Sequence, residues 1–281
     1  MAEVIDGILI REVETKNIMT KSSLPVGGYS VNPYVGCTHA CKYCYASFMK
    51  RFTGHKEEWG TFLDVKHWPE IKNPKKYAGQ RVVIGSVTDG YNPQEEQFGN
   101  TRKLLEQLIG SDADILICTK SDLVVRDIDL LKKHGRVTVS WSINTLDENF
   151  KNDMDSASSI ERRIAAMKQV YEAGIRTVCF VSPVFPGITD FEAIFERVKD
   201  QCDLFWLENL NLRGGFKKTI MDYIAGQYPD LVPLYDEIYN KHNRSYFEAL
   251  EVKAEKMAKK YDCAFVDNEM PYGRVPQGHP V

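Results

Sequence analysis

Six short apolar runs alternate with amphipathic stretches along this chain, and the alternation constrains its fold more than any other feature. The runs are Tyr29–Val35, Arg81–Val87, Asp114–Thr119, Arg136–Ile143, Thr177–Val181 and Asp203–Leu210. The helical patterns are Thr101–Ile109, Asp127–His134, Ser158–Ala173 and Phe191–Lys199. Such alternation predicts parallel strand–helix–strand units. Six units are too few for a closed eight-stranded barrel, so we expect an α/β fold built as a partial (β/α)6 TIM-type barrel.

The remaining segments extend this core without indicating a second domain. A mostly helical pattern covers Lys217–Lys260, and an apolar run at Cys263–Val266 is expected to add a closing strand. We expect Thr53–Gln80 to be a polar, aromatic insertion, the first residues to be loosely ordered, and the last nine to lie on the surface or to continue into further residues. Residues 1–281 are therefore expected to form one domain, with a barrel core at about 29–213 and a helical extension at about 214–281.

Composition excludes several classes of protein. No apolar run reaches the roughly 18 residues of a membrane helix, and the acidic start is unlike a signal peptide. The seven cysteines are an odd count, which fits a reducing cytoplasm better than a disulfide framework. Cys118, Cys179 and Cys263 lie in apolar runs, where a cysteine behaves as a small buried hydrophobe. The net charge of −3 gives no global attraction for nucleic acid.

The other notable feature is a cluster of cysteines, Cys37, Cys41 and Cys44, in the segment GCTHACKYCYAS. The cluster follows the first predicted strand, which places it at the mouth of a parallel barrel. One interpretation is structural zinc, with His39 or His55 as the fourth ligand. Thioredoxin-like redox chemistry and three unrelated cysteines are weaker interpretations. The favoured one is a four-iron cluster, because three thiolates leave one iron open to a substrate.

The spacing CxxxCxxC, with Tyr43 before the last cysteine, resembles the signature of the radical S-adenosylmethionine (SAM) superfamily. The segments GSVTDGYNPQE, ICTKSDLVVRDIDLL, VSWSINTLD and VSPVFPGITD resemble successive strand motifs of its spore photoproduct lyase-like branch. The resemblance runs from about Val31 to Arg213. It implies a partial barrel and a [4Fe–4S] cluster whose open iron binds the SAM amine and carboxylate. It also implies reduction by a donor such as flavodoxin or ferredoxin, and a 5′-deoxyadenosyl radical that abstracts hydrogen from a substrate.

The fourth predicted strand carries a polar face. Because side chains alternate along a strand, Thr138, Ser140, Ser142 and Asn144 share the face opposite Val139. A parallel barrel buries both faces, so these polar groups need partners, which a bound SAM would supply. The alternative is that the hydroxyls bond neighbouring backbone groups.

The resemblance assigns cofactor contacts to strand ends. It implies that Ser86–Asp89 contacts the methionyl amine, that Lys120 pairs with the carboxylate, and that Tyr43 packs against adenine. Lysines after strands are more often solvated loop residues, which is the alternative for Lys120. The full set of expected SAM contacts is Tyr43, Ser86, Thr88, Asp89, Lys120, Ser140, Ser142, Asn144, Ser182 and Pro183.

The substrate is expected near the sixth strand. The candidate contacts are Tyr45, Tyr91, Trp206, Glu208, Asn209 and Arg213. Glu208 and Arg213 could bind a substrate or pair with each other, and the aromatics could belong to the core.

Three functional hypotheses follow from the sequence. The first is a radical SAM enzyme acting on an unidentified substrate, with a second radical SAM protein as a candidate partner in a mobile-element-borne pair. The second is a pyrimidine photoproduct repair lyase, which is less favoured because the C-terminal third lacks an obvious basic hairpin for a duplex. The third is a zinc-binding module without catalysis.

Overall fold

The computed structural model describes residues 2–22, 28–261 and 265–266. Its strands are β1 Ala2–Ile5, β2 Ile8–Glu14, β3 Thr20–Lys21, β4 Tyr29–Val31, β5 Tyr34–Val35, β6 Phe62–His67, β7 Arg81–Ile84, β8 Asp114–Thr119, β9 Arg136–Ser142, β10 Arg176–Val184, β11 Leu204–Asn209 and β12 Phe265–Val266. Its α-helices are α1 Glu95–Phe98, α2 Asn100–Gln107, α3 Ile128–Leu131, α4 Glu148–Met154, α5 Ile160–Glu172, α6 Phe191–Val198, α7 Gly214–Gln227, α8 Val232–Tyr239 and α9 Ser245–Tyr261. Short 3₁₀ helices are η1 Tyr45–Phe52, η2 Pro74–Tyr77, η3 Leu123–Asp127, η4 Lys199–Gln201 and η5 Pro229–Leu231.

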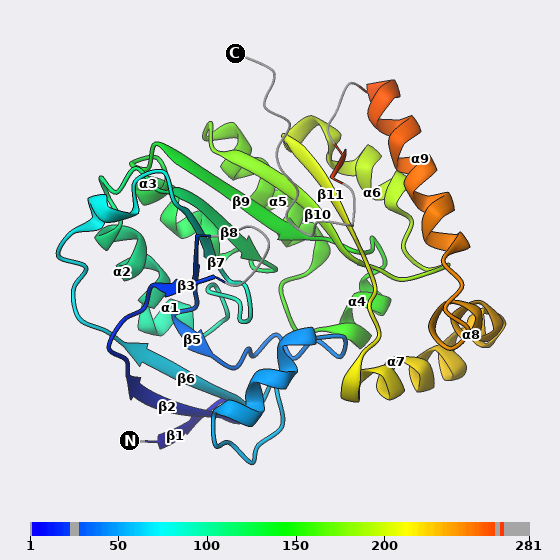
Figure 1. Ribbon diagram of the computed structural model, residues 1–281, viewed down its shortest axis with the longest axis horizontal. Coiled ribbons are helices and arrows are strands. Elements are labelled where there is room, and N and C mark those ends of the chain that lie inside the picture. The colour runs from blue at the N-terminus through cyan, green and yellow to red at the C-terminus, as the bar shows by residue number, and fades with distance from the viewer. Residues whose placement is uncertain (1, 23–27, 262–264, 267–281) are drawn as a thin grey trace.

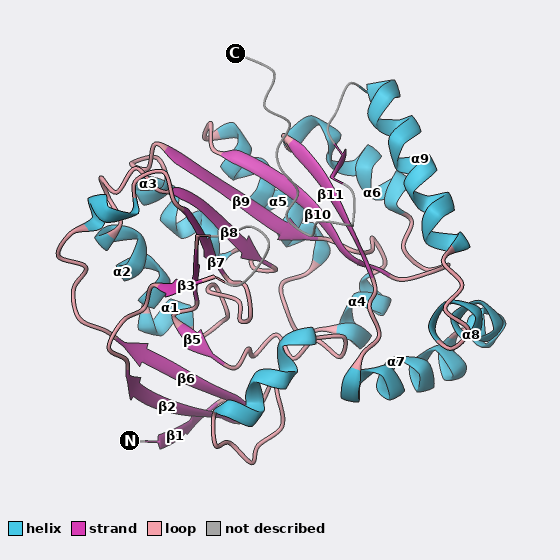
Figure 2. Cartoon of the chain, in the orientation of Figure 1, coloured by secondary structure: helices cyan, strands magenta, loops and turns pink. Residues whose placement is uncertain are grey.

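The larger of two mixed sheets carries the predicted α/β alternation. Its strand order is β12-β11-β10-β9-β8-β7-β4-β3, and Figures 1 and 2 show β7 to β11 side by side. Every neighbouring pair from β4 to β12 is parallel, and only β3 runs antiparallel to its neighbour. Strands β7, β8, β9, β10 and β11 match the predicted runs closely, and the expected closing strand is present as β12, although Cys263 lies outside the described residues.

The two faces of this sheet pack differently. Ile84, Val139 and Trp141 belong to the main core, which includes buried residues of α2, α5 and α6. The opposite face carries a smaller cluster made by Val83, Leu116, Val178, Leu204 and Trp206. We call this opposite face the inner face. Gly174, after α5, has φ of +79°, the left-handed geometry of the predicted helix cap.

The prediction that the first apolar run forms a single strand is wrong. Tyr29–Val31 joins the large sheet, whereas Tyr34–Val35 pairs antiparallel with β6 in a second sheet of order β1-β2-β6-β5. Pro33 separates the two halves, and a proline has no N–H with which to continue a strand ladder. The chain therefore changes sheets immediately before the cysteine segment.

The expectation of a loosely ordered start is also corrected, and the insertion, whose structure the sequence did not indicate, contributes a strand. Strand β2 pairs in parallel with β6, which comes from the predicted insertion. A small core of Ile10, Tyr34, Leu63 and Val65 holds this sheet together. Charged residues interrupt these apolar positions, so neither segment shows a strong strand pattern alone.

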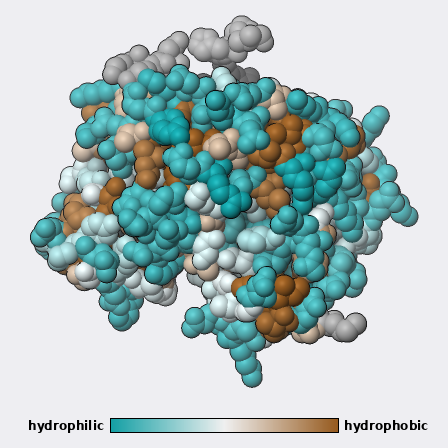
Figure 3. Space-filling model, turned by 180° about the vertical axis from the view of Figure 1, so that it is seen from behind, coloured by the Kyte–Doolittle hydropathy of each residue, from teal (hydrophilic) through white to brown (hydrophobic). Residues whose placement is uncertain are grey.

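Residues 214–261 form α7, α8 and α9, in line with the predicted helical pattern. Ile220, Ile224 and Tyr235 pack with Tyr43 and Phe185 in a cluster near the cysteine segment. No helix among the described residues is long and apolar enough to span a membrane. The rear face is mostly hydrophilic, with separate hydrophobic patches (Figure 3). The final nine residues lie outside the described range.

Candidate functional site

The three clustered cysteines lie in the segment between β5 and η1, and this segment runs below the carboxyl ends of β8 and β9 in Figure 1. All three are free thiols. The pKa of Cys37 is raised to about 12, mainly by burial and in part by the nearby Asp89 and Cys44. Burial likewise raises the pKa of Cys41, with added contributions from Cys44 and Cys37. The thiols therefore lie near one another, although no group of three or more histidine, cysteine or acidic side chains in the described ranges has metal-binding geometry.

The two histidines considered as a fourth zinc ligand have other partners. His55 contacts Glu57 through Nδ1 at 2.8 Å and Asp64 through Nε2 at 2.9 Å. His39 Nδ1 lies 3.3 Å from an Asp89 carboxylate oxygen. Both nitrogens of His55 are occupied, so the ring offers no free lone pair for a metal in this arrangement.

Backbone hydrogen bonds attach the cysteine segment to the connection between α4 and α5. The Lys42 amide donates to the Met154 carbonyl at 2.9 Å, and the Ser156 amide donates to the His39 carbonyl at 2.8 Å. On the other side, Thr38 Oγ1 donates to Gln94 Oε1 at 2.6 Å. Contacts on two sides therefore hold the segment in place.

Two residues that the sequence did not single out reinforce this attachment. The Tyr43 hydroxyl donates to Asp155 Oδ2 at 3.1 Å, and Arg163 Nη2 donates to Asp155 Oδ1 at 2.8 Å. Burial opposes ionisation of Asp155, but Arg163 and Lys120 outweigh it and lower its pKa. Arg163 Nη1 also donates to the Ser142 carbonyl at 3.1 Å. Arg163 thus connects Tyr43, through Asp155, to the end of β9.

Asp89 is bonded by groups from several segments. Its carboxylate accepts from the Lys120 amide at 2.7 Å, from the Tyr91 amide at 2.8 Å and from Thr119 Oγ1 at 2.9 Å. These bonds and His39 lower its pKa despite burial, which acts in the opposite direction. Asp89 therefore joins the ends of β7 and β8 to the cysteine segment.

The other residues of the β7 end are also hydrogen-bonded within the protein. The Ser86 hydroxyl shares a hydrogen bond with Ser30 and accepts from Asn32 Nδ2 at 3.1 Å. Thr88 donates to the Gly36 carbonyl, which directly precedes Cys37. The Tyr45 hydroxyl donates to the Ser86 carbonyl, although the Tyr45 side chain is largely exposed.

Strand β9 confirms the predicted alternation, and two buried polar groups, one on the strand and one just after it, have no partners among the described residues. Ser140 pairs in register with Cys118 and Val178, which belong to or pack on the inner cluster. Ser140 is 1% exposed and Asn144 is 3% exposed. Neither Ser140 Oγ nor Asn144 Nδ2 has a hydrogen-bond partner among the described residues. Because such groups are costly to bury, the inner face of β9 fits a polar ligand such as SAM.

Lys120 lies beside the cysteine segment rather than in a solvated loop. Its Nζ is 5.7 Å from the centre of the Tyr43 ring. Burial lowers the pKa of Lys120, but the nearby Cys41 and Asp155 outweigh it, so the net shift is upward. A lysine held in its charged form can attract a carboxylate.

Ser182 and Glu208 meet on neighbouring strands, where the Ser182 hydroxyl donates to Glu208 Oε2. Burial raises the pKa of Glu208, and the Ser182 hydrogen bond and Lys120 offset only part of the shift. Trp206, two residues earlier, packs edge-on against Phe180 at 5.9 Å, and its buried Nε1 has no partner among the described residues. Pro183 follows Ser182 in β10 and is partly buried.

The remaining candidate residues have less direct connections to this group. Tyr91 is fully buried and its hydroxyl donates to Asp127 Oδ2 at 3.1 Å. Arg213 Nε donates to Asn211 Oδ1 at 2.8 Å, and within the described residues Arg213 forms no ion pair with Glu208. Asn209 ends β11, where it pairs in register with Val184.

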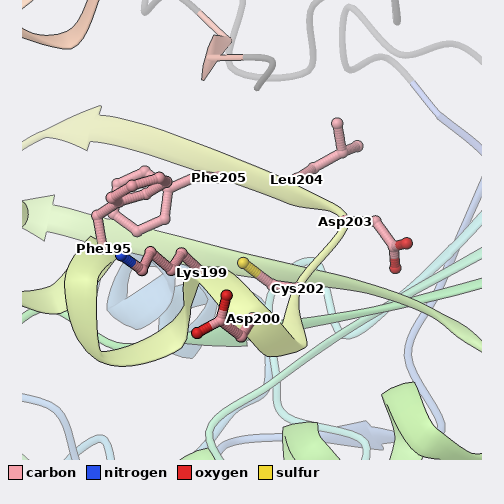
Figure 4. Close-up of a pocket in the computed structure, with 7 residues that line it drawn as sticks. All are labelled: Phe195, Lys199, Asp200, Cys202, Asp203, Leu204 and Phe205. Atoms are coloured by element: carbon pink, nitrogen blue, oxygen red, sulfur yellow. The ribbon is translucent and has the colours of Figure 1, made fainter. Parts of the chain in front are cut away.

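A pocket of about 280 Å³ lies at the amino end of β11. Its lining residues come from α6, η4 and the start of β11, and Figure 4 shows them: Phe195, Lys199, Asp200, Cys202, Asp203, Leu204 and Phe205. This pocket is at the opposite end of the strand from Glu208, so it is separate from the residues described above.

Sequence comparison relates most of the chain to known proteins. The family model for the Radical SAM superfamily matches residues 31–198. An uncharacterised protein of Methanocaldococcus jannaschii is 36% identical over 236 residues, covering 83% of this chain and 88% of the relative. The Radical SAM Nalpha-GlyT isomerase of Pseudomonas phage M6 is 27% identical over 180 residues, covering 62% of this chain and 36% of the isomerase.

The fold is similar to that of spore photoproduct lyase. A mutant lyase solved with bound AdoMet and dinucleoside spore photoproduct superposes with a TM-score of 0.58 at 19% identity. The match covers 78% of this chain and 66% of the lyase chain. The lyase complexed with dinucleoside spore photoproduct gives a TM-score of 0.57 at 17% identity. At these sequence identities, the structural similarity shows a shared fold only.

Proposed function

Because this chain belongs to the radical SAM superfamily, we propose that Cys37, Cys41 and Cys44 bind a [4Fe–4S] cluster with which the enzyme cleaves SAM. When bound, the cluster supplies the electron that splits SAM into methionine and a 5′-deoxyadenosyl radical, which removes hydrogen from the substrate. The family match favours this centre over the structural zinc that cysteine spacing alone left open.

The observation that carries this proposal is a pair of unpartnered buried groups, Ser140 Oγ on β9 and Asn144 Nδ2 two residues after the strand ends. Ser140 is next to Cys118 of β8, and β8 leads into Lys120. Lys120 is in turn close to Cys41. A ligand with hydroxyls, an ammonium and a carboxylate would satisfy these groups, and SAM has all three. We therefore assign SAM to the inner face, between the cysteine segment and β9.

Other residues would shape this site. Ser142, Ser182, Pro183 and Tyr43 are proposed as further SAM contacts near the ribose and adenine. Hydrogen bonds within the protein already engage the side chains of Ser86, Thr88 and Asp89. Their proposed contribution is therefore indirect: they hold in place the strand ends and the cysteine segment that would border the SAM amine. We also propose that the parallel strands form the expected partial (β/α)6 barrel in a single domain, with the C-terminal helices as an extension.

The substrate would bind on the side of β10 and β11. Glu208 is the favoured contact because it is largely buried and its pKa is raised, which suits a group that exchanges a proton or a hydrogen bond with a ligand. Trp206 would contribute an N–H donor, and Asn209 and Tyr45 would border the same end of the strands. The exposed Arg213 and the core residue Tyr91 have weaker support.

A nucleic-acid substrate is the second candidate, and η1 provides a specific observation for it. Phe48 and Phe52 are exposed on this helix, immediately after the cysteine segment. The Arg51 guanidinium lies 5.3 Å from the Phe48 ring centre and 4.7 Å from that of Phe52. Exposed aromatic rings with cations suit stacking on unpaired bases. The structurally similar spore photoproduct lyase was solved with a bound dinucleoside spore photoproduct. The nucleic-acid alternative is therefore a pyrimidine photoproduct lyase.

The proposed partners follow from the chemistry. The cluster requires a one-electron donor of the flavodoxin or ferredoxin class, which suits a cytoplasmic location. The phage relative is consistent with a mobile-element protein that works beside a second radical SAM protein.

The cluster assignment is tested by metal analysis of protein reconstituted without oxygen. Wild type should contain about four iron and four sulfide per chain. Replacing Cys37, Cys41 and Cys44 together by Ala should remove both, whereas Cys202→Ala, in the separate pocket, should retain them. A full cluster in the triple variant, or zinc alone in wild type, would contradict the proposal. For the alternative, fluorescence anisotropy of single-stranded oligonucleotides should show salt-dependent binding that Phe48→Ala with Phe52→Ala weakens.

A further inference from the structure

The turn before β6 carries a tryptophan close to the cysteine segment. The Thr61 amide donates to the Glu58 carbonyl at 3.1 Å, which closes a four-residue turn with Trp59 and Gly60 at its centre. Gly60 has a φ of +105°, and a Cβ there would lie 2.7 Å from the Cβ of Ala40. Because a larger residue would push the turn away, Gly60 allows Trp59 to approach the cysteine segment closely.

Phe62 fixes the position of the Trp59 ring. The two rings pack edge-on with their centres 5.8 Å apart, and the Phe62 ring also stacks on His55 at 3.9 Å. Phe62 is fully buried, and a Cβ at Gly36 would lie 2.3 Å from its carbonyl oxygen. The indole is therefore held by a buried neighbour that itself lies against the start of the cysteine segment.

The indole N–H of Trp59 lacks a hydrogen-bond acceptor. Nε1 is buried and has no partner of ordinary hydrogen-bond geometry among the described residues. Burial raises the pKa of Cys44, and Trp59, acting as a side-chain donor, is one of the groups that oppose this rise. The Cys44 sulfur is therefore within reach of the Trp59 N–H, and a buried donor without a partner is costly.

We propose that Trp59 Nε1 donates a hydrogen bond to Cys44 Sγ when that sulfur binds the cluster, and that this bond raises the reduction potential of the cluster. The inference rests on the proposed function and extends it to a residue outside the cysteine segment. A sulfur bound to iron is a thiolate, which accepts hydrogen bonds more strongly than a protonated thiol. It would give the Trp59 N–H the partner that it lacks.

The direction of the effect follows from charge. An added electron makes the sulfur ligands of a cluster more negative, so a hydrogen bond donated to one of them stabilises the reduced form more than the oxidised form. Without the Trp59 N–H, the same electron donor would reduce the cluster less completely. Trp59 acts through Cys44, so this role requires no contact with SAM or with the substrate.

The test compares Trp59→Phe with Trp68→Phe. Phenylalanine keeps an aromatic ring but has no N–H, and the Trp68 N–H already donates to Gln107 Oε1 at 3.0 Å. The midpoint potential of the reconstituted cluster is measured by a redox titration followed by electron paramagnetic resonance. At one fixed potential, the ratio of reduced to oxidised cluster should be about threefold lower in Trp59→Phe than in wild type, a shift of about 30 mV at 59 mV per factor of ten. Trp68→Phe should match wild type.

The outcomes separate this inference from the proposed function. A wild-type protein that binds no four-iron cluster would overturn the proposed function and this inference with it. A full cluster whose potential is the same in wild type and Trp59→Phe would overturn the role of Trp59 alone, as would an equal shift in Trp68→Phe.

A second readout detects the hydrogen bond itself. Protein labelled with ¹⁵N in its tryptophan indoles is reconstituted and reduced, and pulsed electron paramagnetic resonance measures the coupling of ¹⁵N to the electron spin of the cluster. Wild type should show a ¹⁵N coupling, which Trp68→Phe keeps and Trp59→Phe loses. Labelled wild type without any ¹⁵N coupling, or a coupling that persists in Trp59→Phe, would contradict the proposed bond.

Discussion

Arg163 and Asp155 form an ion pair of 2.8 Å in which both side chains are almost completely buried. Through this pair, the guanidinium that bonds the Ser142 carbonyl is linked to the Tyr43 hydroxyl of the cysteine segment. The two segments proposed to hold the cluster and SAM are therefore connected by one charged pair.

Removing one member of this pair should destabilise the fold strongly. Asp155→Asn or Arg163→Met leaves an uncompensated buried charge or donor, and we expect a loss of about 3–5 kcal/mol in the free energy of unfolding. Urea denaturation of the protein without cluster measures it. Arg197→Met breaks the exposed pair with Glu161 and serves as the control, with an expected loss of about 0–1 kcal/mol. If breaking either pair lowered the free energy of unfolding by a similar amount, the claim that the buried pair matters more for stability would be wrong.

Ser140→Ala should separate ligand binding from stability. The hydroxyl has no protein partner, so its removal should leave the stability of the ligand-free protein unchanged or higher. SAM affinity, measured by calorimetry on reconstituted protein, should fall by about 1–3 kcal/mol because a ligand group then lacks its partner.

Asn144→Ala, Ser142→Ala and Lys120→Ala should weaken SAM binding in the same direction. Each removes a side chain proposed to face the ligand, and we expect about 1–3 kcal/mol for a lost buried partner. Unchanged affinity in all of these variants and in Ser140→Ala would show that SAM binds elsewhere.

Glu208 should make stability depend on pH. Its pKa is raised in the folded protein by burial, with Ser182 and Lys120 acting against the shift. Between the ordinary glutamate pKa and the raised value, the folded state keeps a proton that the unfolded state has lost. Stability from this group is therefore present below the ordinary pKa and is lost as pH rises through the raised one. Urea titrations should show a shallower fall with pH in Glu208→Gln than in wild type, and parallel curves would contradict the assignment.

Much of the large sheet could be predicted from the sequence because its signals are local. Strands such as β8 and β9 are continuous apolar runs, and the alternation along β9 predicted which side chains would share a face. The cysteine spacing likewise lies within eight residues, so it could be recognised without any knowledge of the fold.

The missed features depend on contacts between distant segments. Tyr43 and Asp155 are 112 positions apart, and nothing near Asp155 distinguishes it from a surface acid before the chain is folded. The second sheet has only a small core, so β2 and β6 show their apolar faces only once they pair. The inward orientation of Cys118 also depends on its register with β9.

The central claim is that this chain cleaves SAM at a cluster held by Cys37, Cys41 and Cys44, and product analysis after reduction tests it most directly. Reconstituted wild-type protein, given dithionite and SAM without oxygen, should release 5′-deoxyadenosine and methionine in equal amounts. The triple variant with Ala at all three cysteines should release neither, while Cys202→Ala should behave as wild type. Failure of cluster-loaded wild type to form 5′-deoxyadenosine, or equal formation by the triple variant, would contradict the account.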